Sequence, residues 1–177
     1  MNRLHIMGAA GSGTTTLGRA LAVQLPHIHL DTDDYFWAVK YTQQTEIPKR
    51  IQALRQGLSK QEKWILSGAV CGWGEELKSS FEAVIFLSVP EKIRMERLKQ
   101  REIGRYGSDI LPGGPLFDQH QTFMDWASLY ETGGMDIRSR ALHEHWLSGL
   151  SCPILKVEGI QTVDEEVETV LKWLRII

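Results

Sequence analysis

Short apolar segments and longer amphipathic segments alternate along most of the chain. Apolar runs too short for helices predict five strands, at Arg3–Met7, Ile28–Leu30, Trp64–Leu66, Ala83–Val89 and Ile154–Val157. Apolar positions at helical spacing predict helices at Thr14–Leu25, Pro48–Ser59, Glu75–Phe81, Pro90–Glu102, Met135–Leu150 and Val163–Leu174. This alternation favours an α/β fold, in which helices cover both faces of a parallel sheet.

One stretch departs from the alternation. From Gly104 to Gly134 the sequence is rich in glycine and proline and irregular in pattern, with the helix breakers Leu111–Pro115 inside it. An irregular segment of this length is unusual in a compact domain unless it has a function. We therefore expect residues 104–134 to form a lid. Because no linker-like segment divides the chain, we expect residues 1–177 to form a single domain.

The composition excludes several classes of protein. The 177 residues carry 20 lysines and arginines against 22 aspartates and glutamates, for a formal net charge of -2. Proteins that bind nucleic acid through its phosphates usually show a basic excess, so we expect no nucleic-acid partner. Only two cysteines occur, Cys71 and Cys152, and no stretch has 18 or more apolar residues. These features favour a cytoplasmic protein without a membrane segment.

The first predicted strand runs into a glycine-rich loop. The segment Gly8–Thr15 matches the phosphate-loop pattern GxxxxGK[ST] at every fixed position except one, where Thr14 replaces the lysine. Such loops bind nucleotide phosphates with backbone N–H groups and a helix N-terminus, while a hydroxyl, here that of Thr15, ligates Mg²⁺. The alternative is a plain glycine-rich turn between a strand and a helix. The pattern predicts binding of ATP and Mg²⁺ by Gly8, Gly11, Ser12, Gly13, Thr14, Thr15 and Thr16.

The missing lysine changes the chemistry of this loop. Threonine offers only a neutral donor where lysine would neutralise charge on the β and γ phosphates. Loss of one such donor costs roughly 2.7–4 kcal/mol of activation barrier in comparable sites. Our hypothesis is that arginines from the later charged helix supply the cation. Without them the protein would be a slow enzyme, or a module that senses a nucleotide with little turnover.

The loop also resembles a known family. Its sequence GSGTTT, at residues 11–16, looks like the phosphate loop of archaeal-type cytidylate kinases, which also lack the lysine. More broadly, nearly the whole chain resembles the nucleoside-monophosphate-kinase-like group, which includes adenylate, cytidylate, shikimate and gluconate kinases. The resemblance implies the P-loop NTPase fold, with a five-stranded parallel sheet of order 2-3-1-4-5 and a mobile lid. It also implies transfer of the γ-phosphoryl group of ATP to a small acceptor.

An acidic cluster, Asp31–Asp34, follows the second predicted strand. In open α/β sheets this end of a strand faces the crevice where ligands bind. The segment resembles the Asp-x-Phe/Tyr pattern of uridine and nicotinamide riboside kinases, in which an aspartate accepts the proton of the acceptor hydroxyl. That resemblance implies Asp33 as the general base, with Asp31 or Asp34 assisting Mg²⁺ through water. The alternative is a helix N-cap with a solvated turn.

The resemblance to the nucleoside-monophosphate-kinase-like group also implies roles for later residues. Arg94, Arg97 and Arg101 recur at helical spacing after the fourth strand, where the lid helix of the similar kinases carries arginines that bind phosphates. We therefore expect Arg97 and Arg101 to contact phosphates during catalysis, whereas the alternative is a solvated helix face. Gly159, after the fifth strand, is implied as an adenine contact. Further polar candidates in and after the lid are His120, Arg138 and Arg140.

The acceptor stays open at this point. Ser67 and Gly68 end the third strand, where shikimate kinase-like proteins have a glycine-rich turn and nucleotide kinases have Asp-Gly. The aromatic residues after the acidic cluster, Tyr35–Trp37, could stack on an acceptor ring or belong to the core. The sequence therefore predicts a small-molecule or nucleotide kinase as an enzyme class, and it leaves open the acceptor, the choice of ATP or GTP, and the oligomeric state.

Overall fold

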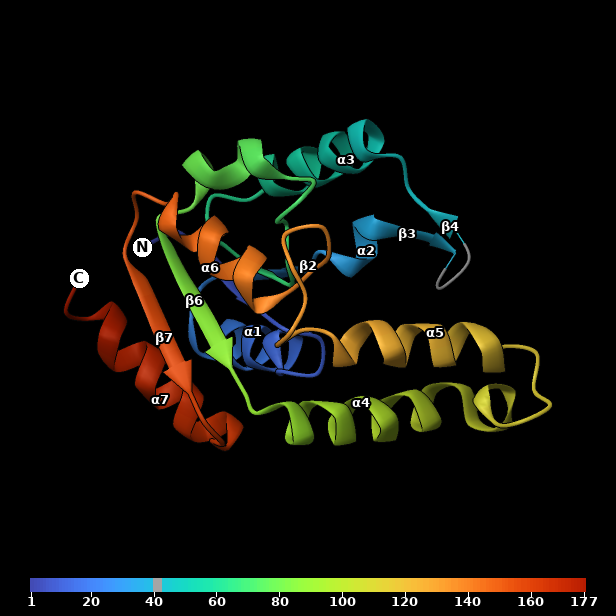
Figure 1. The fold of residues 1–177 in the computed structure, drawn as a ribbon. Helices are drawn as coiled ribbons and strands as arrows, with labels where there is room; N and C mark the ends of the chain where they lie inside the picture. Colours follow the sequence, from blue (N-terminus) through green and yellow to red (C-terminus); the bar gives the residue numbers. More distant parts are fainter. Residues whose placement is uncertain (40–42) are drawn as a thin grey trace.

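The computed structural model describes residues 1–39 and 43–177. Its centre is a five-stranded parallel sheet in which the strands lie in the order β2-β5-β1-β6-β7 (Figure 1). The strands are β1 (Arg3–Gly8), β2 (Ile28–Asp31), β5 (Trp64–Ser67), β6 (Ala83–Ser88) and β7 (Ile154–Glu158). Numbered by their order along the chain, these five strands follow the predicted order 2-3-1-4-5, so the predicted fold class is confirmed.

Helices cover both faces of this sheet. One face packs against α1 (Thr14–Gln24) and α7 (Val163–Leu174). The other face is covered by α3 (Ile47–Ser59), the 3₁₀ helix η1 (Glu75–Ser80) and α6 (Arg140–Ser148), as Figure 1 shows. The predicted helix at Met135–Leu150 is shorter at both ends. It begins after Ser139, which caps α6 by accepting a hydrogen bond from the Leu142 N–H, and it ends before Gly149.

Two hydrophobic clusters lie on the two faces of the sheet. Leu66 and Phe86 belong to the cluster beneath α3 and α6, whereas the neighbouring Ile65 and Ile85 belong to the one beneath α1 and α7. All four side chains are almost completely buried. The central strands are therefore apolar on both faces, which explains why their sequences form continuous apolar runs instead of alternating. The ends of these buried strands give the phosphate loop a rigid base.

The segment expected to form a lid, residues 104–134, is largely helical, which corrects the expectation of an irregular segment. Helix α4 (Glu91–Tyr106) extends four residues past the predicted end at Glu102, and after the 3₁₀ helix η2 (Gly107–Ile110) the chain returns along α5 (Phe117–Ser128). The two helices contact each other and project away from the sheet (Figure 1). Both prolines of this region lie in the turn between the helices, and α5 itself contains neither glycine nor proline.

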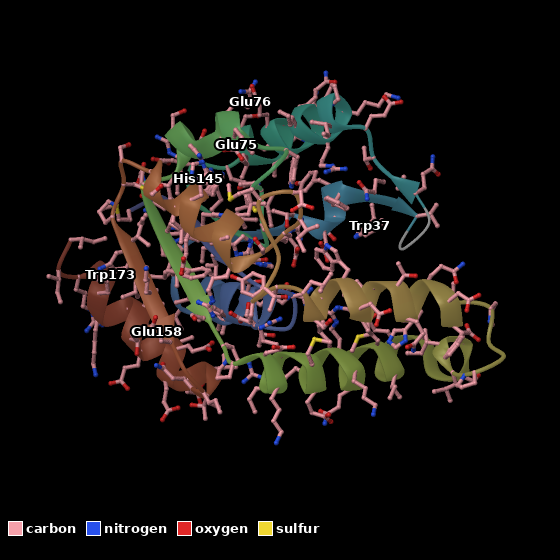
Figure 2. The ribbon with its side chains drawn as sticks, viewed as in Figure 1. Trp37, Glu75, Glu76, His145, Glu158 and Trp173 are labelled. Atoms are coloured by element: carbon pink, nitrogen blue, oxygen red, sulfur yellow. The ribbon has the colours of Figure 1, made fainter. Side chains whose placement is uncertain are left out.

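A small substructure that the sequence pattern did not predict lies between β2 and α3. It consists of the one-turn helix α2 (Asp33–Phe36) and a hairpin of β3 (Trp37–Val39) with β4 (Gln43–Gln44). Trp37 lies where α2 meets β3, on the side of the molecule that carries α5, and far from Trp173 on α7 (Figure 2). Within the described residues, no helix is both long enough and apolar enough to cross a membrane.

Candidate active site

A cavity of about 790 Å³ lies between the phosphate loop, the α2–β4 substructure and the lid helices. Its lining comes from segments that are far apart in the sequence. The lining residues are Gly8–Gly11, Gly13–Thr16, Arg19, Asp31, Asp33, Phe36, Trp37, Gln44, Gly68, Ala69, Arg97, Arg101, Arg105, Gln119, Thr122, Phe123, Trp126 and Arg138. Most of the predicted phosphate-binding and catalytic residues therefore share one cavity.

The phosphate loop joins β1 to α1 at the edge of this cavity. Gly11 and Gly13 adopt left-handed backbone conformations, with φ of 82° and 101°. Gly8 lacks a side chain for a different reason, because a Cβ there would lie 2.4 Å from Ser12 Oγ and 2.8 Å from the Leu87 carbonyl oxygen. The Ser12 hydroxyl is thus packed inside the loop. This geometry leaves the backbone of the loop to face the cavity, as in other anion-binding loops.

Hydrogen bonds connect this loop to the carboxyl ends of β2 and β5. Thr15 Oγ1 donates to Asp31 Oδ2 at 2.6 Å, and Ser67 Oγ donates to the same oxygen at 3.1 Å. His29 Nε2 lies 2.9 Å from Ser67 Oγ, and burial lowers the pKa of His29. The Thr15 hydroxyl and the Asp31 carboxylate are oxygen donors of the kind that Mg²⁺ prefers, and they already converge. These two residues therefore fit a magnesium ion.

The acidic cluster divides into two parts. Asp33 lies beside Asp31, whose Oδ1 accepts the Asp33 backbone N–H at 3.0 Å, and both residues line the cavity. Asp34 is exposed and is not part of the lining, so the structure does not bring it to the phosphate loop with the other predicted metal residues. Partial burial raises the pKa of the Asp34 carboxyl, and the negative charges of Asp31 and Asp33 raise it further.

The two predicted arginines approach the loop from α4. Arg97 Nη1 donates to the Ser12 carbonyl oxygen at 3.5 Å. Arg101 lines the cavity and pairs with Glu102, at 2.6 Å between Nη2 and Oε1. Burial, and then the neighbouring Arg105, lower the pKa of Arg101, whereas Asp33 and Asp31 act in the opposite direction. Arg101 therefore lies in the electrostatic field of both carboxylates and lines the same cavity.

Gly159 lies outside this group. It forms the turn after β7 with φ of 87°, and its N–H donates to the Ser88 carbonyl oxygen at 3.0 Å. It is exposed and is not among the cavity's lining residues, so its contact with adenine stays a prediction. The turn is positioned by the end of β6, which also carries the segment leading into α4.

Comparison with known proteins places the chain in a family. Residues 5–109 match a family model described as an AAA domain, and this span contains the phosphate loop, the acidic cluster and α4. The chain belongs to this AAA-domain family. A relative from Bacillus subtilis (strain 168), the uncharacterized protein YqaC, is 56% identical over 171 residues, which cover 97% of this chain and 96% of that protein.

Two solved structures with the same fold as this AAA-domain protein are kinases. Shikimate kinase from Bacteroides thetaiotaomicron aligns with a TM-score of 0.62 at 18% identity, covering 98% of both chains. A gluconokinase from Sinorhizobium meliloti 1021 aligns with a TM-score of 0.53 at 16% identity, covering 96% of this chain and 89% of that one. The AAA-domain protein therefore has the fold of phosphate-loop kinases. The closer resemblance to cytidylate kinases stays a prediction.

Several lining residues of this AAA-domain protein carry no recognisable motif. Arg19 lies one helical turn after the loop, and Gln119, Thr122 and Phe123 come from α5, within the segment predicted to be irregular. The i, i+3, i+4 spacing of the α5 residues was the signal that could have found them. Of the other polar candidates, Arg138 reaches the cavity, whereas His120 is buried in α5 and Arg140 is hydrogen-bonded to Glu131.

Proposed function

We propose that this protein transfers the γ-phosphoryl group of Mg-ATP to a hydroxyl of a small acceptor. The observation that carries the proposal is the hydrogen bond between Thr15 and Asp31. It joins the hydroxyl of the phosphate loop to the acidic cluster. The nucleotide side of the cavity, formed by the loop, and the acceptor side, which begins at the acidic cluster, are therefore adjacent. The kinase folds of the solved structures named above support the same reaction class.

The loop residues bind and orient the phosphates in this proposal. Backbone N–H groups from Gly11 to Thr16 and the N-terminus of α1 face the nucleotide. Thr15 and Asp31 hold Mg²⁺, which neutralises phosphate charge when it is bound. Gly159 and Ser12 contribute backbone only. Catalysis of this kind rests on positioning and on charge neutralisation, because the transition state asks for little covalent chemistry from the protein.

Asp33 acts as the general base, holding the proton of the acceptor hydroxyl on its carboxylate. The Asp33 backbone is fixed by Asp31, which keeps the two carboxylates at the carboxyl end of β2. Arg97 and Arg101 contact the transferred phosphoryl group once the lid, residues 104–134 of this single domain, closes over the cavity and excludes water. Planar guanidinium groups suit the equatorial oxygens of that group.

The acceptor carries an anionic group in this proposal. Arg138 sits with its guanidinium carbon 5.7 Å from the ring centroids of both Phe36 and Trp126. No carboxylate in the described part of the chain pairs with it, and residues 40–42 contain no acidic residue. The described lining is positive in balance, with Arg19, Arg97, Arg101, Arg105 and Arg138 against Asp31 and Asp33. A carboxylate or phosphate on the acceptor would satisfy Arg138.

A second candidate function is nucleotide sensing with little turnover. Thr14 favours it, because this residue lines the cavity at the position of the usual lysine and brings no charge. Both functions require nucleotide binding, so binding alone does not distinguish them.

The deciding experiment measures ADP release from Mg-ATP against a panel of acceptors. The panel compares hydroxylated carboxylic acids, nucleoside monophosphates, and neutral nucleosides and sugars. Stimulation by an anionic acceptor class above the rate without acceptor supports the kinase. Tight ATP binding with no stimulation across the panel would support the sensor, and stimulation by neutral acceptors alone would contradict the role given to Arg138.

A further inference from the structure

A third arginine of α4 lies beneath the phosphate loop and does not reach the cavity. Arg94 is completely buried, and its Nη1 donates to the Ala10 carbonyl oxygen at 3.1 Å. Helix and loop are in close contact at this point, because a Cβ on Gly11 would lie 2.5 Å from the Arg94 carbonyl oxygen. A completely buried arginine is rare unless its charge is paired with an acidic group or bound to a ligand.

The bond to Ala10 fixes the orientation of one peptide unit. In a trans peptide the C=O and the following N–H point in opposite directions, and the described chain contains no cis bond. Arg94 holds the Ala10 carbonyl away from the cavity, so the Gly11 N–H points to the opposite side, and Gly11 lines the cavity. The Gly11 N–H finds no backbone acceptor within the described residues. It is thus available to an anion.

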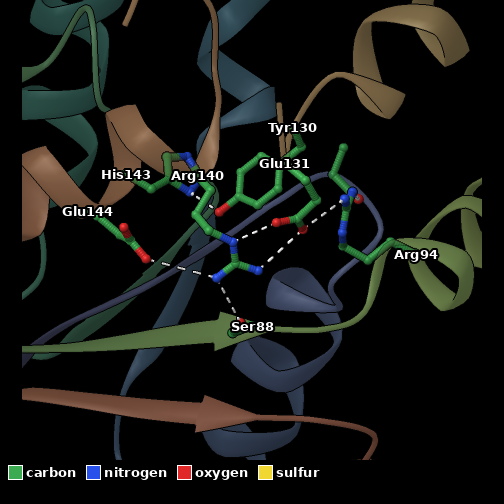
Figure 3. Close-up of polar contacts among 8 residues, drawn as sticks. Ser88, Arg94, Tyr130, Glu131, Arg140, His143 and Glu144 are labelled. Carbon is green, nitrogen blue, oxygen red and sulfur yellow. Dashed lines mark hydrogen bonds and ion pairs between the residues drawn. The ribbon is translucent and has the colours of Figure 1, made fainter. Parts of the chain in front are cut away.

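The charge of Arg94 is only partly compensated. Its Nη2 lies 3.6 Å from Glu131 Oε1, but Glu131 accepts two hydrogen bonds from Arg140, at 2.6 and 3.2 Å (Figure 3). Two guanidinium groups therefore share one carboxylate at the base of the loop. Arg94 also lies over the Tyr130 ring, at 4.8 Å, while its Nε has no hydrogen-bond partner in the described part of the chain.

Glu144 does not restore the balance. It lies 4.0 Å from Arg140 Nη1, at the limit of an ion pair, and its side chain is half exposed, so water screens it (Figure 3). Burial lowers the pKa of Arg94, but a guanidinium stays protonated in proteins. Glu91, in the first turn of α4, also acts on Arg94, but it is exposed and therefore screened by water. The base of the loop thus keeps an excess of positive charge that solvent screens poorly.

We propose that Arg94 is a positioning residue that partly replaces the missing lysine from beneath the loop. It holds the Ala10–Gly11 peptide with its N–H toward the phosphates and polarises that peptide through a charged hydrogen bond. Thr14 carries no positive charge on the cavity side of the loop. The Arg94 guanidinium therefore supplies positive charge from the buried side of the loop. The inference rests on the proposed nucleotide binding, and it adds a residue that never touches the ligand.

The test compares ADP binding by calorimetry in the wild type, Arg94→Met, Arg94→Lys and the matched control Arg55→Met. Arg55 pairs with Glu76 on the surface, through α3 and η1, away from the loop. We expect Arg94→Met to bind ADP about tenfold more weakly, as for the loss of a charged hydrogen bond, and Arg94→Lys to stay within about threefold of the wild type. Arg55→Met should bind like the wild type. Thermal unfolding confirms that each variant is folded.

Thr14→Lys provides the readout that a merely structural role would not move. If Arg94 stands in for the lysine, Thr14→Lys raises ADP affinity more in the Arg94→Met background than in the wild type. Equal gains in the two backgrounds, or equal losses in Arg94→Met and Arg94→Lys, would overturn the inference.

Two further outcomes keep the test decisive. A wild type that binds neither ADP nor ATP refutes the proposed function itself, whereas a wild type that binds with Arg94→Met unchanged refutes only the role of Arg94. If Arg94→Met does not fold, Arg94→Gln takes its place, since it keeps an N–H donor for the Ala10 carbonyl and removes the charge. Undiminished binding in folded Arg94→Gln would also overturn the inference.

Discussion

The two sides of the cavity are built differently. On the nucleotide side, the loop rests on buried strand ends, and arginines of α4 hold its carbonyl groups at Ala10 and Ser12. On the acceptor side, the walls come from a one-turn helix and two strands of three and two residues, and Phe36 and Trp37 are only partly buried. The more extensive support thus lies at the proposed phosphate site, and short elements surround the proposed acceptor site.

This difference has a physical consequence for stability. Segments with few buried apolar contacts open locally at low free-energy cost, whereas segments tied to the core open only with the whole fold. We expect the α2–β4 substructure to exchange its amide protons faster than the phosphate loop. A change on the nucleotide side should then alter chemistry or global stability, and a change on the acceptor side other than at Asp33 should alter acceptor binding alone.

The largest effect is expected at Asp33, where the two sides meet. Asp33→Asn removes the general base and keeps the side-chain volume, so kcat should fall by about 10²–10⁴, the usual contribution of a positioned base. ADP affinity should change little. Steady-state kinetics with the acceptor found in the panel, together with calorimetry, check both expectations.

Asp34 supplies the matched control. It lies beside Asp33 in α2 but outside the cavity lining, so Asp34→Asn should leave kcat within about threefold of the wild type. A loss of activity in Asp34→Asn as large as in Asp33→Asn would contradict the division of the acidic cluster described above.

The next effect belongs to the two arginines of α4. Replacing Arg97 and Arg101 together with alanine removes two cations near the transferred group, and kcat should fall by about 10²–10³. In a nucleotide sensor the same variant would only weaken binding. Single-turnover measurements separate the two cases, and unchanged turnover in the double variant would remove the lid from the proposed chemistry.

A smaller effect is expected on the acceptor side. Arg50 stacks on the Phe36 ring at 3.9 Å, and Arg138 approaches the same ring at 5.7 Å. Phe36→Ala removes this support, and the acceptor KM should rise about tenfold, as for the loss of a buried cation–π contact, with nucleotide affinity unchanged. Phe36→Tyr, which keeps the ring, is the control. An effect of Phe36→Ala on ADP affinity would show that the two sides are coupled.

The same contrast explains what the sequence could predict. The five strands and the phosphate loop followed from apolar runs and from a motif whose geometry is local, and the strand order followed from the family resemblance. The hydrogen bond between Thr15 and Asp31 was not predicted, because it joins segments that only the fold brings together. The α2–β4 substructure has neither signal, because its strands are too short for a periodic pattern. The glycines and prolines near Leu111–Pro115 concealed α5, since they mark only the turn between two helices.

Arg94 shows a different limit of sequence analysis. Its spacing to Arg97 and Arg101 places all three on one helix, but the spacing does not tell which one faces the interior. That distinction depends on the close approach of α4 to Gly11, where a side chain on residue 11 would not fit. Partners such as Glu131 are even less predictable, because they are brought into place only by the return of the chain through the lid.

The smallest effect concerns pH and a carboxyl group that lies outside the cavity but interacts with the charge of Arg97 on the nucleotide side. Glu166 on α7 is 5% exposed, and burial raises the pKa of its carboxyl to about 7, with Arg97 acting in the opposite direction. Between about pH 4.5 and 7 the folded protein therefore binds more protons at this group than the unfolded chain, so the free energy of unfolding falls as the pH rises through this range.

Glu166→Gln should remove that loss of free energy of unfolding. Compared with the wild type, the variant should gain about 1 kcal/mol in free energy of unfolding at pH 8 relative to pH 5. Urea unfolding at the two pH values measures the gain, and Glu168→Gln, on the exposed side of the same helix, should show none. Equal pH dependence in the wild type and Glu166→Gln would mean that Glu166 is solvated, and the inner face of α7 would then be less tightly packed than its burial indicates.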